Sequence, residues 1–293
     1  MKERGYQITI FLIIALICIT SFLPLLYVIS TSLVMEAEYV AKDGFVLWPN
    51  QATLSAYKRL LAMESIYNGF FISVVRTLVG TLMMLSMTTI TAYIVSRPNM
   101  PGARALMLML LVTILFNGGL IPTFLLLKDL GFYNNFWVFI IPSLIDSWSV
   151  LVLRQFMMNL PRELEESAGM DGANEVKLFT HIILPMSLPS VAAIAIFIAV
   201  FHWNDWFTAL IYIEADKLKP LQLVVRNMLV SNAGTNATID TNIGVNLFDP
   251  TRRVGEQTLK LATVVVGTLP ILMVYPFLQK YFVKGMYVGA VKE

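Results

Sequence analysis

Long apolar runs dominate this chain and decide what it can fold into. The first extends from Ile8 to Leu33, behind Lys2 and Arg4. It is longer than the roughly 7–15 apolar residues of a signal peptide and has no small-residue cleavage site, so it predicts a transmembrane helix. Pro24 is expected to be tolerated there as a kink. Charged residues make up 14% of the chain, against about 25% in soluble domains, which indicates an integral membrane protein.

Five further runs complete an expected set of six spans in an all-α membrane protein with one domain over residues 1–293. The six expected spans are residues 8–33, 67–96, 105–127, 135–152, 186–213 and 258–282. Longer polar stretches, residues 34–66 and 214–257, are expected as loops on one side of the membrane. Arg76 lies inside the second span, where a lipid-facing charge would be costly, so its side chain is expected to face protein or water.

Basic residues in the short segments predict the orientation, because Lys and Arg favour the cytoplasmic side. An even number of spans places both termini on the same side. The segments on that side carry Lys2, Arg4, Arg97, Arg104, Lys280, Lys284 and Lys292. The competing short loop carries only Lys128. Both termini and the polar segment 159–185 are therefore predicted to be cytoplasmic.

The polar segment 159–185 is too charged for lipid and too regular for a slack loop, so it predicts two short helices joined by a turn. Pro161 suits a first helical turn. Glutamates come after it at the positive helix end, at positions 163, 165 and 166. Gly172 can take a positive φ at the turn, and Asp171 is a plausible cap for the second helix.

The second helix of this segment is expected to have a narrow apolar face. Val176, Phe179 and Ile183 recur at i, i+3 and i+7. Pro185 is expected to end the helix.

Polar groups within the fourth and fifth spans leave two interpretations open. They are Asp146, Ser147 and Trp148 in one span and His202, Trp203, Asn204, Asp205 and Trp206 in the other. Polar residues at membrane depth indicate a substrate pathway, and aromatic rings suit the faces of sugars. They are equally compatible with an aromatic belt at the interface and with hydrogen bonds between helices. Asn117-Gly118-Gly119 is expected to form a close helix crossing.

The sequence contains no recognisable catalytic arrangement. Cys18 is the only cysteine, which excludes an intrachain disulfide or a cysteine metal cluster. His181 and His202 are the only histidines and flank the fifth span, so they are not expected to share a metal site. There is no GxxxxGK[ST] phosphate-binding loop. The chain is therefore not expected to be an enzyme, and any ATP must be hydrolysed by a partner.

The segment 159–185 resembles the EAA loop of ABC importer permeases. Glu166-Ser167-Ala168, then Gly172, then Ile182-Ile183-Leu184-Pro185 carry the resemblance, with Ser167 where the family has Ala. In that family the loop docks into a cleft on the ATP-hydrolysing subunit. The resemblance implies ATPase contacts for Glu166, Ser167, Ala168, Asp171, Gly172, Phe179 and Pro185.

Other segments resemble carbohydrate-importer permeases of the maltose-permease type. They are residues 116–122, 202–206, 219–223 and 275–285. Within the complex-oligosaccharide branch, the chain is similar to the smaller permease of bacterial alginate importers. The resemblance implies a type I permease fold in the bacterial inner membrane. The implied partners are a second permease, two ATPase subunits that bind ATP and Mg, an extracytoplasmic solute-binding protein, an oligosaccharide and membrane lipid, without nucleic acid.

The leading interpretation is a permease that couples ATP hydrolysis in its partners to alternating access. An ATP-independent transporter or channel would be marked by inverted repeats or an ionisable relay within the spans, and neither stands out. An ABC permease for peptides or amino acids is a further alternative, because the preference for sugar rests on resemblance alone.

Overall fold

The computed structural model describes residues 2–97, 99–230, 255 and 257–273. Over these ranges the chain is helical and contains no strand, which confirms the predicted all-α class. The chain divides into two compact units. One comprises Met1–Tyr67 and Val224–Pro270, and the other comprises Asn68–Leu223 and Ile271–Glu293.

The first unit begins with the long helix α1 (Lys2–Ser32), which runs through Pro24. Its apolar part, Tyr6–Ser32, has 27 residues, enough at about 1.5 Å per residue to cross a bilayer core of about 30 Å. None of its most apolar window is buried in the chain itself. The first span is therefore a helix whose sides are available to lipid or to a partner chain.

The stretch after α1 is ordered and folds back on the end of that helix. It contains α2 (Glu36–Ala41) and α3 (Ser55–Leu61). Thr53 N donates to Leu33 O at 2.8 Å, and the Thr31 hydroxyl donates to Val46 O at 3.2 Å. The unit also includes the helix Gln257–Met273, the described part of the sixth expected span. The rest of that span, most of the stretch 231–256, and Lys280, Lys284 and Lys292 lie outside the described residues.

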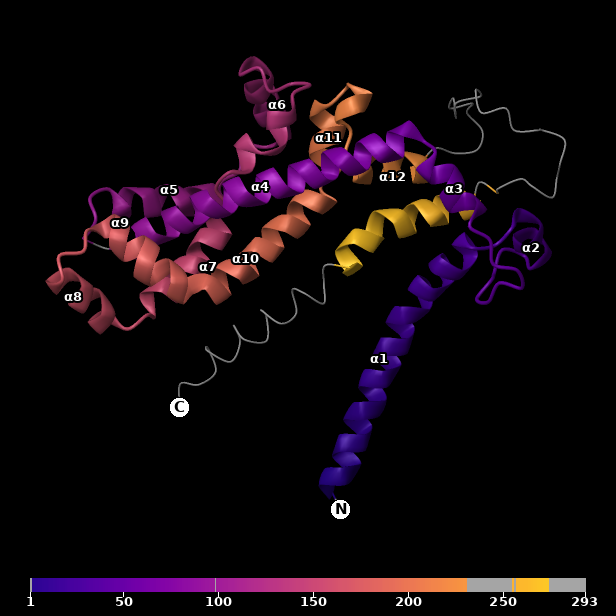
Figure 1. The fold of residues 1–293 in the computed structure, drawn as a ribbon, viewed down its shortest axis with the longest axis horizontal. Coiled ribbons are helices and arrows are strands. Elements are labelled where there is room, and N and C mark those ends of the chain that lie inside the picture. Colours follow the sequence, from indigo (N-terminus) through magenta and orange to yellow (C-terminus); the bar gives the residue numbers. More distant parts are fainter. Residues whose placement is uncertain (1, 98, 231–254, 256, 274–293) are drawn as a thin grey trace. The chain divides into compact units, whose positions relative to one another are not determined.

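The second unit is built along α4 (Glu64–Ser96), most of which lies in it (Figure 1). After α4 come α5 (Ala103–Leu115), α6 (Leu120–Asp129), two 3₁₀ turns (Phe136–Phe139 and Ile141–Ser143), α7 (Ser147–Met158), α8 (Arg162–Met170), α9 (Glu175–Leu178), a π-helical turn (Phe179–Ile183), α10 (Leu184–Asn204), α11 (Phe207–Tyr212) and a 3₁₀ turn (Asp216–Leu218). The next helix, α12 (Leu221–Val230), begins in this unit, but most of its residues belong to the first unit.

The stretch expected as the third span, residues 105–127, consists of two helices separated by a break. Phe116 is extended and Gly119 has φ +86°, which ends α5 and starts α6 anew. The Asn117 side chain accepts a hydrogen bond from Gly119 N at 2.9 Å, a local turn that competes with the helix. A Cβ built on Gly118 would meet nothing within 4 Å, so no described residue of this chain makes the expected close helix crossing there.

The helix that contains the fifth expected span begins before the expected start of that span. Glu175–Asn204 forms one continuous helix of 30 residues, and Pro185 lies at the start of α10 instead of ending a separate helix. A π-helical turn, Phe179–Ile183, precedes it. Proline lacks an N–H and crowds the preceding turn, and a local π turn accommodates such a disturbance without ending the helix. The helix also ends before residue 213, the expected end of the span, because α10 stops at Asn204.

Within the described residues, three helices are long and apolar enough to cross a membrane: Tyr6–Ser32, Glu64–Ser96 and Glu175–Asn204. A fourth span is possible for Phe136–Ser143 with Ser147–Met158, two segments bent by 45°. The shorter apolar helices are Ala103–Leu115, Leu221–Val230 and Gln257–Met273.

Two apolar cores stabilise the second unit. The first core gathers Met84, Tyr93, Leu153, Ala168, Leu178, Ile183 and Ile194 with their neighbours, and so joins α4 to α7, α8, α9 and α10. The second core gathers Leu127, Val138, Phe139, Ile140, Ala209, Tyr212, Ile213 and Leu223, and so joins α6, the 3₁₀ turns and α11. The two cores share no buried residue.

A close crossing between α4 and α10 lies at Gly80. A Cβ added there would be 2.6 Å from His202 Nε2, so only glycine leaves room for the imidazole. His202 is 1% exposed. The close approach expected at Gly118-Gly119 therefore occurs at a glycine that the sequence did not single out.

We expect Gly80→Ala to destabilise the protein by about 1–3 kcal/mol, because the new methyl group must displace a buried ring. The thermal unfolding midpoint of the detergent-solubilised chain measures the effect. Gly118→Ala is the control, since its added methyl group meets open space. Equal midpoints for the two variants would contradict a close crossing at Gly80.

Candidate functional site

The polar segment 159–185 contains two helices joined by a sharp turn, as predicted. Pro161 precedes α8, and Glu163 and Glu165 lie in its first turn, at the positive end of the helix dipole. Gly172 has φ +76°. Gly172 N donates to Gly169 O and Ala173 N donates to Ala168 O, the paired hydrogen bonds of a Schellman motif.

The cap of the second helix differs from the prediction. Asp171 closes the end of α8, whereas the side chain of Asn174 accepts a hydrogen bond from Lys177 N at 2.9 Å and begins α9. The Schellman turn uses the backbone as far as Ala173, so Asn174 is the first residue able to cap α9.

The predicted apolar face of the second helix is correct only in part. Phe179 and Ile183 pack on the first core, but Val176 is 70% exposed and Leu178 is buried instead. The spacing i, i+3, i+7 assumes a regular α-helix, and the π turn at Phe179–Ile183 changes that spacing.

The residues predicted to contact a partner divide into two groups. Glu166, Ser167, Asp171, Gly172 and Pro185 are exposed. Ala168 and Phe179 belong to the chain's own core, Phe179 with its ring centroid 4.9 Å from that of Tyr93. These two side chains support the exposed turn and do not form its surface.

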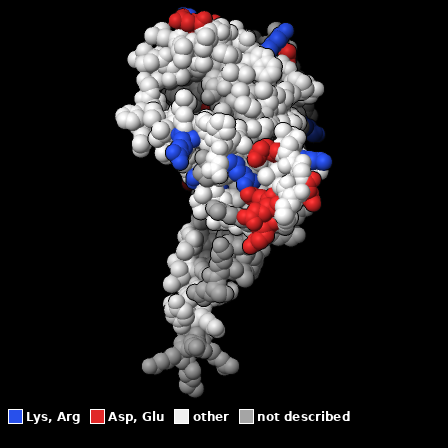
Figure 2. Space-filling view, turned by 90° about the vertical axis from the view of Figure 1, so that its left-hand side faces the viewer, with Lys and Arg blue, Asp and Glu red and all other residues white. Residues whose placement is uncertain are grey.

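The exposed turn carries apolar as well as acidic side chains. Met170 is 84% exposed and Val176 is 70% exposed. The Ser167 hydroxyl donates to Glu163 O at 2.7 Å, so serine at this position leaves no hydroxyl without an acceptor. Figure 2 views the end of the molecule where α8 and α9 lie, and acidic and basic side chains gather beside one another on it.

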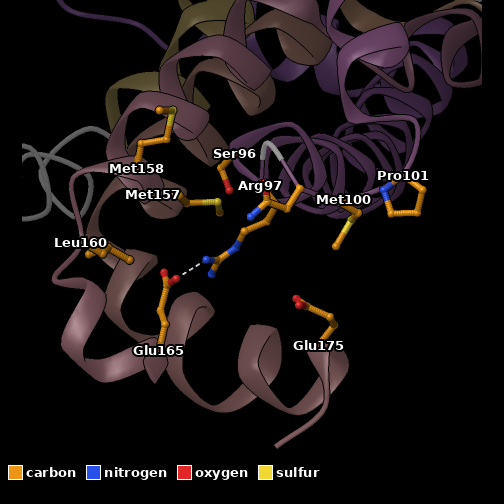
Figure 3. A pocket seen from close by; sticks show the side chains of 10 residues that line it. Ser96, Arg97, Met100, Pro101, Met157, Met158, Leu160, Glu165 and Glu175 are labelled. Atoms are coloured by element: carbon orange, nitrogen blue, oxygen red, sulfur yellow. Dashed lines mark hydrogen bonds and ion pairs between the residues drawn. The ribbon is translucent and has the colours of Figure 1, made fainter. Parts of the chain in front are cut away.

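Two polar contacts, which we call ties, join the segment 159–185 to the end of α4 and to the turn that follows α4. Arg97 forms an ion pair with Glu165 of α8 (Figure 3), and the Tyr93 hydroxyl bonds to the carboxylate of Glu175. The Arg97 guanidinium lies 5.0 Å from the centre of the Tyr93 ring. Burial alone would lower the pKa of Arg97, but the hydrogen bond and charge of Glu165 raise it above its ordinary value.

A cavity of about 470 Å³ lies between α8 and the end of α4. Its lining residues are Ser96, Arg97, Asn99, Met100, Pro101, Met157, Met158, Leu160, Glu165 and Glu175 (Figure 3). The ties through Arg97 and Tyr93 were not predicted from the sequence. The basic residue after a span had indicated orientation only, and nothing local marks its partner.

The second candidate region is the polar cluster at the end of α10. Arg76 is 1% exposed, and its Nη1 donates to the backbone oxygen of Asp205 at 2.6 Å while Nη2 pairs with the Asp205 carboxylate. The guanidinium also lies 4.3 Å from the centre of the Phe139 ring. The prediction that Arg76 faces protein or water is confirmed.

Asp205 has a second role in the backbone. Its other carboxylate oxygen accepts a hydrogen bond from Thr208 N at 3.0 Å, at the start of α11. One carboxylate therefore neutralises Arg76 and also stabilises the helix that begins after the break at Asn204.

The remaining polar residues of the fifth span do not share one surface. His202 is buried at Gly80, and Trp203 is 7% exposed and forms a T-shaped ring contact with Phe70. Asn204 and Trp206 are exposed.

The fourth-span residues divide in the same way. Asp146 accepts hydrogen bonds from Ser149 N and the Ser149 hydroxyl, at 2.8 and 2.6 Å, and so caps α7. Trp148 is 54% exposed and forms a T-shaped ring contact with Phe197 of α10. The predicted substrate pathway therefore narrows, as a prediction, to Trp148, Asn204 and Trp206.

Comparison with known families gives a match over most of the chain. Residues 60–288 match the family described as "Binding-protein-dependent transport system inner membrane component". The chain is 38% identical, over 100% of both chains, to the polygalacturonan/rhamnogalacturonan transport system permease protein YtcP of Bacillus subtilis (strain 168).

Solved structures agree with this match. The chain resembles a chain of a bacterial ABC transporter involved in the import of the acidic polysaccharide alginate, with a TM-score of 0.85 and 26% identity over 96% of this chain and 98% of that one. A second structure is a bacterial alginate ABC transporter in complex with an alginate pentasaccharide-bound periplasmic protein. It matches with a TM-score of 0.59 and 14% identity over 94% and 93% of the two chains, a likeness of fold.

We expect Asp205→Ala to destabilise the protein by about 3 kcal/mol, because it leaves a buried guanidinium without its counter-charge. Thermal unfolding in detergent measures this. Asp216→Ala is the matched control, since Asp216 pairs with Lys219 but its side chain is 91% exposed. Such an exposed pair contributes about 1 kcal/mol or less. The interpretation is wrong if both variants unfold at the same temperature.

Proposed function

The chain belongs to the family of binding-protein-dependent transport system inner membrane components, and from this we propose that it is the permease subunit of an ATP-driven oligosaccharide importer. The observation that carries the proposal is the exposed turn between α8 and α9, with Gly172 at its tip. The chain is not itself catalytic. Its role would be to convert movement of an ATP-hydrolysing partner into movement of its own spans.

The backbone offers a direct route for that movement. The turn leads into α9, which continues without a break through the π turn into α10, as one helical stretch of 30 residues from Glu175 to Asn204. A continuous helix transmits displacement along its axis. Nucleotide-driven closure of the partner would shift the turn, and rigid-body movement of α10 would open the transport pathway to alternate sides of the membrane.

The proposed coupling surface is formed by the exposed members of the predicted set: Glu166, Ser167, Asp171, Gly172 and Pro185. We add Met170 and Val176, because exposed apolar side chains beside acidic ones suit a protein partner. Ala168 and Phe179 would hold this surface in shape from beneath.

The proposed assembly contains a second, different permease and two copies of an ATPase subunit that bind ATP and Mg. It also contains an extracytoplasmic solute-binding protein, as in the alginate transporter complex. This chain has no phosphate-binding loop, so the partner must bind the nucleotide. The basic residues of its short segments favour a cytoplasmic position for both termini and for the coupling surface.

The proposed cargo is an acidic oligosaccharide. Relatives are named for polygalacturonan and rhamnogalacturonan and for alginate, which are all acidic polysaccharides. Arg76 does not supply a free positive charge for such a substrate, because Asp205 neutralises it. Trp148, Asn204 and Trp206 are the proposed sugar contacts from this chain, through ring stacking and hydrogen bonds.

The cargo is tested by ATP hydrolysis of the co-expressed complex in liposomes, with binding protein loaded with one oligosaccharide at a time. We expect fragments of polygalacturonan, rhamnogalacturonan or alginate to stimulate ATP hydrolysis. The fragment that does so identifies the substrate. Stimulation by neutral oligosaccharides or peptides alone would contradict the acidic cargo. Uptake without any associated ATPase would favour an ATP-independent transporter and would overturn the whole proposal.

Gly172→Leu tests the coupling surface. Leucine at a positive φ costs about 1–2 kcal/mol, and its side chain would project into open space, where the partner is proposed to dock. We expect the variant to insert in the membrane but to bind the ATPase subunit at least about tenfold more weakly. Copurification of the ATPase subunit measures the binding, and sugar uptake measures the consequence for transport.

Gly102→Leu is the control for this test. Gly102 also has a positive φ, +84°, with nothing within 4 Å of an added Cβ, so leucine brings the same strain at the turn before α5. Equal loss of ATPase subunits in both variants would mean that strain, and not docking, explains the effect of Gly172→Leu.

A further inference from the structure

Neighbouring glutamates of α8 have different surroundings. Glu165 pairs with Arg97, and the two side chains are 20% and 19% exposed. Glu166, the next residue, is exposed. One helix therefore presents an acidic side chain outward and holds another against its own chain.

The pair with Arg97 crosses a cavity. The space of about 470 Å³ beneath α8 is lined in part by Met100, Met157 and Met158 (Figure 3). Methionine side chains are flexible and adapt to movement of what lies above them. Ala168 packs α8 on the first core, but the side of α8 that faces the cavity is spanned by the ion pair.

The other half of the segment is held differently. Leu178 and Ile183 are buried in the first core, and α9 continues into α10. Glu175 accepts a hydrogen bond from Tyr93, whose ring lies beside the Arg97 guanidinium. The two ties thus meet at the end of α4, and of the two only the Arg97 tie reaches α8.

We propose that Arg97 is a positioning residue that ties α8 to the end of α4, so that displacement of the coupling surface moves α4 together with α10. This inference rests on the proposed function. Without the tie, only the packing of Ala168 on the first core would link α8 to α4, and α4 would follow displacement of α8 less closely. ATP would still be hydrolysed, but less sugar would be transported for each ATP.

The test uses charge reversal in the assembled complex. Arg97→Glu and Glu165→Arg should each lower the sugar transported per ATP by about tenfold, equivalent to about 1.4 kcal/mol. The double variant, which restores an opposite-charge pair, should recover most of the ratio. Arg104→Glu changes the charge equally at an exposed site in the same region and should leave the ratio unchanged.

A second readout does not depend on transport. In a Cys18→Ser background, a spin label at Met170→Cys, at the exposed end of α8, reports the mobility of that helix in the full chain without ATPase. We expect the label to be more mobile with Arg97→Glu and also with Arg97→Gln, a neutral change that is less disruptive to folding. In the charge-reversed double variant, the mobility of the label should return towards that of the wild type.

These outcomes separate the two proposals. Unchanged label mobility in both Arg97 variants would overturn the tie, whether or not the complex transports sugar. Altered mobility with an unchanged transport ratio would overturn its part in coupling. Absence of ATPase activity in the wild-type complex would count against the proposed function, while the label would still decide whether Arg97 positions α8.

Discussion

The ion pair between Arg76 and Asp205 is the interaction on which the second unit depends. A guanidinium at membrane depth is costly unless a counter-charge and hydrogen-bond acceptors surround it. Asp205 supplies both, with its carboxylate and with its backbone oxygen. Because the last carbonyl groups of a helix lack partners within the helix, the arginine also satisfies the chain where α10 stops. The second core, including Phe139 beneath the guanidinium, assembles around this point.

A similar pairing with a different degree of burial lies just after the C-terminal end of α4. Arg97 and Glu165 are about one-fifth exposed, whereas Arg76 is almost fully buried. A buried pair fixes the helix crossing, while a partly hydrated pair can yield to a partner at lower cost. This difference is consistent with a helix α4 that is held firmly within its length and is more responsive at its C-terminal end, next to the segment that carries the proposed coupling surface.

Burial also explains why so few polar residues are left for a sugar. His202 fills the space at Gly80, Asp205 neutralises Arg76, and Asp146 caps α7. Each polar group in the spans that serves the fold is unavailable to a substrate. In the proposed importer, this chain would contribute a few aromatic and amide contacts, and the second permease and the binding protein would contribute the rest of the recognition.

Local sequence determined much of this protein. The length of the apolar runs predicts the helices, and Gly172 has the positive φ expected of a tight turn, because both properties depend on neighbouring residues. Asn117-Gly118-Gly119 is compatible both with a helix break and with a helix crossing, since composition does not say what lies opposite. Only the tertiary structure decided the partners of the charged residues. Asp205 is 129 residues from Arg76 and Glu165 is 68 residues from Arg97, and no local pattern selects one carboxylate over another at such separations. The course of the helix through Pro185 was likewise decided by packing, because the π turn packs on the first core through Phe179, Ile182 and Ile183, which outweighs the usual tendency of proline to end a helix.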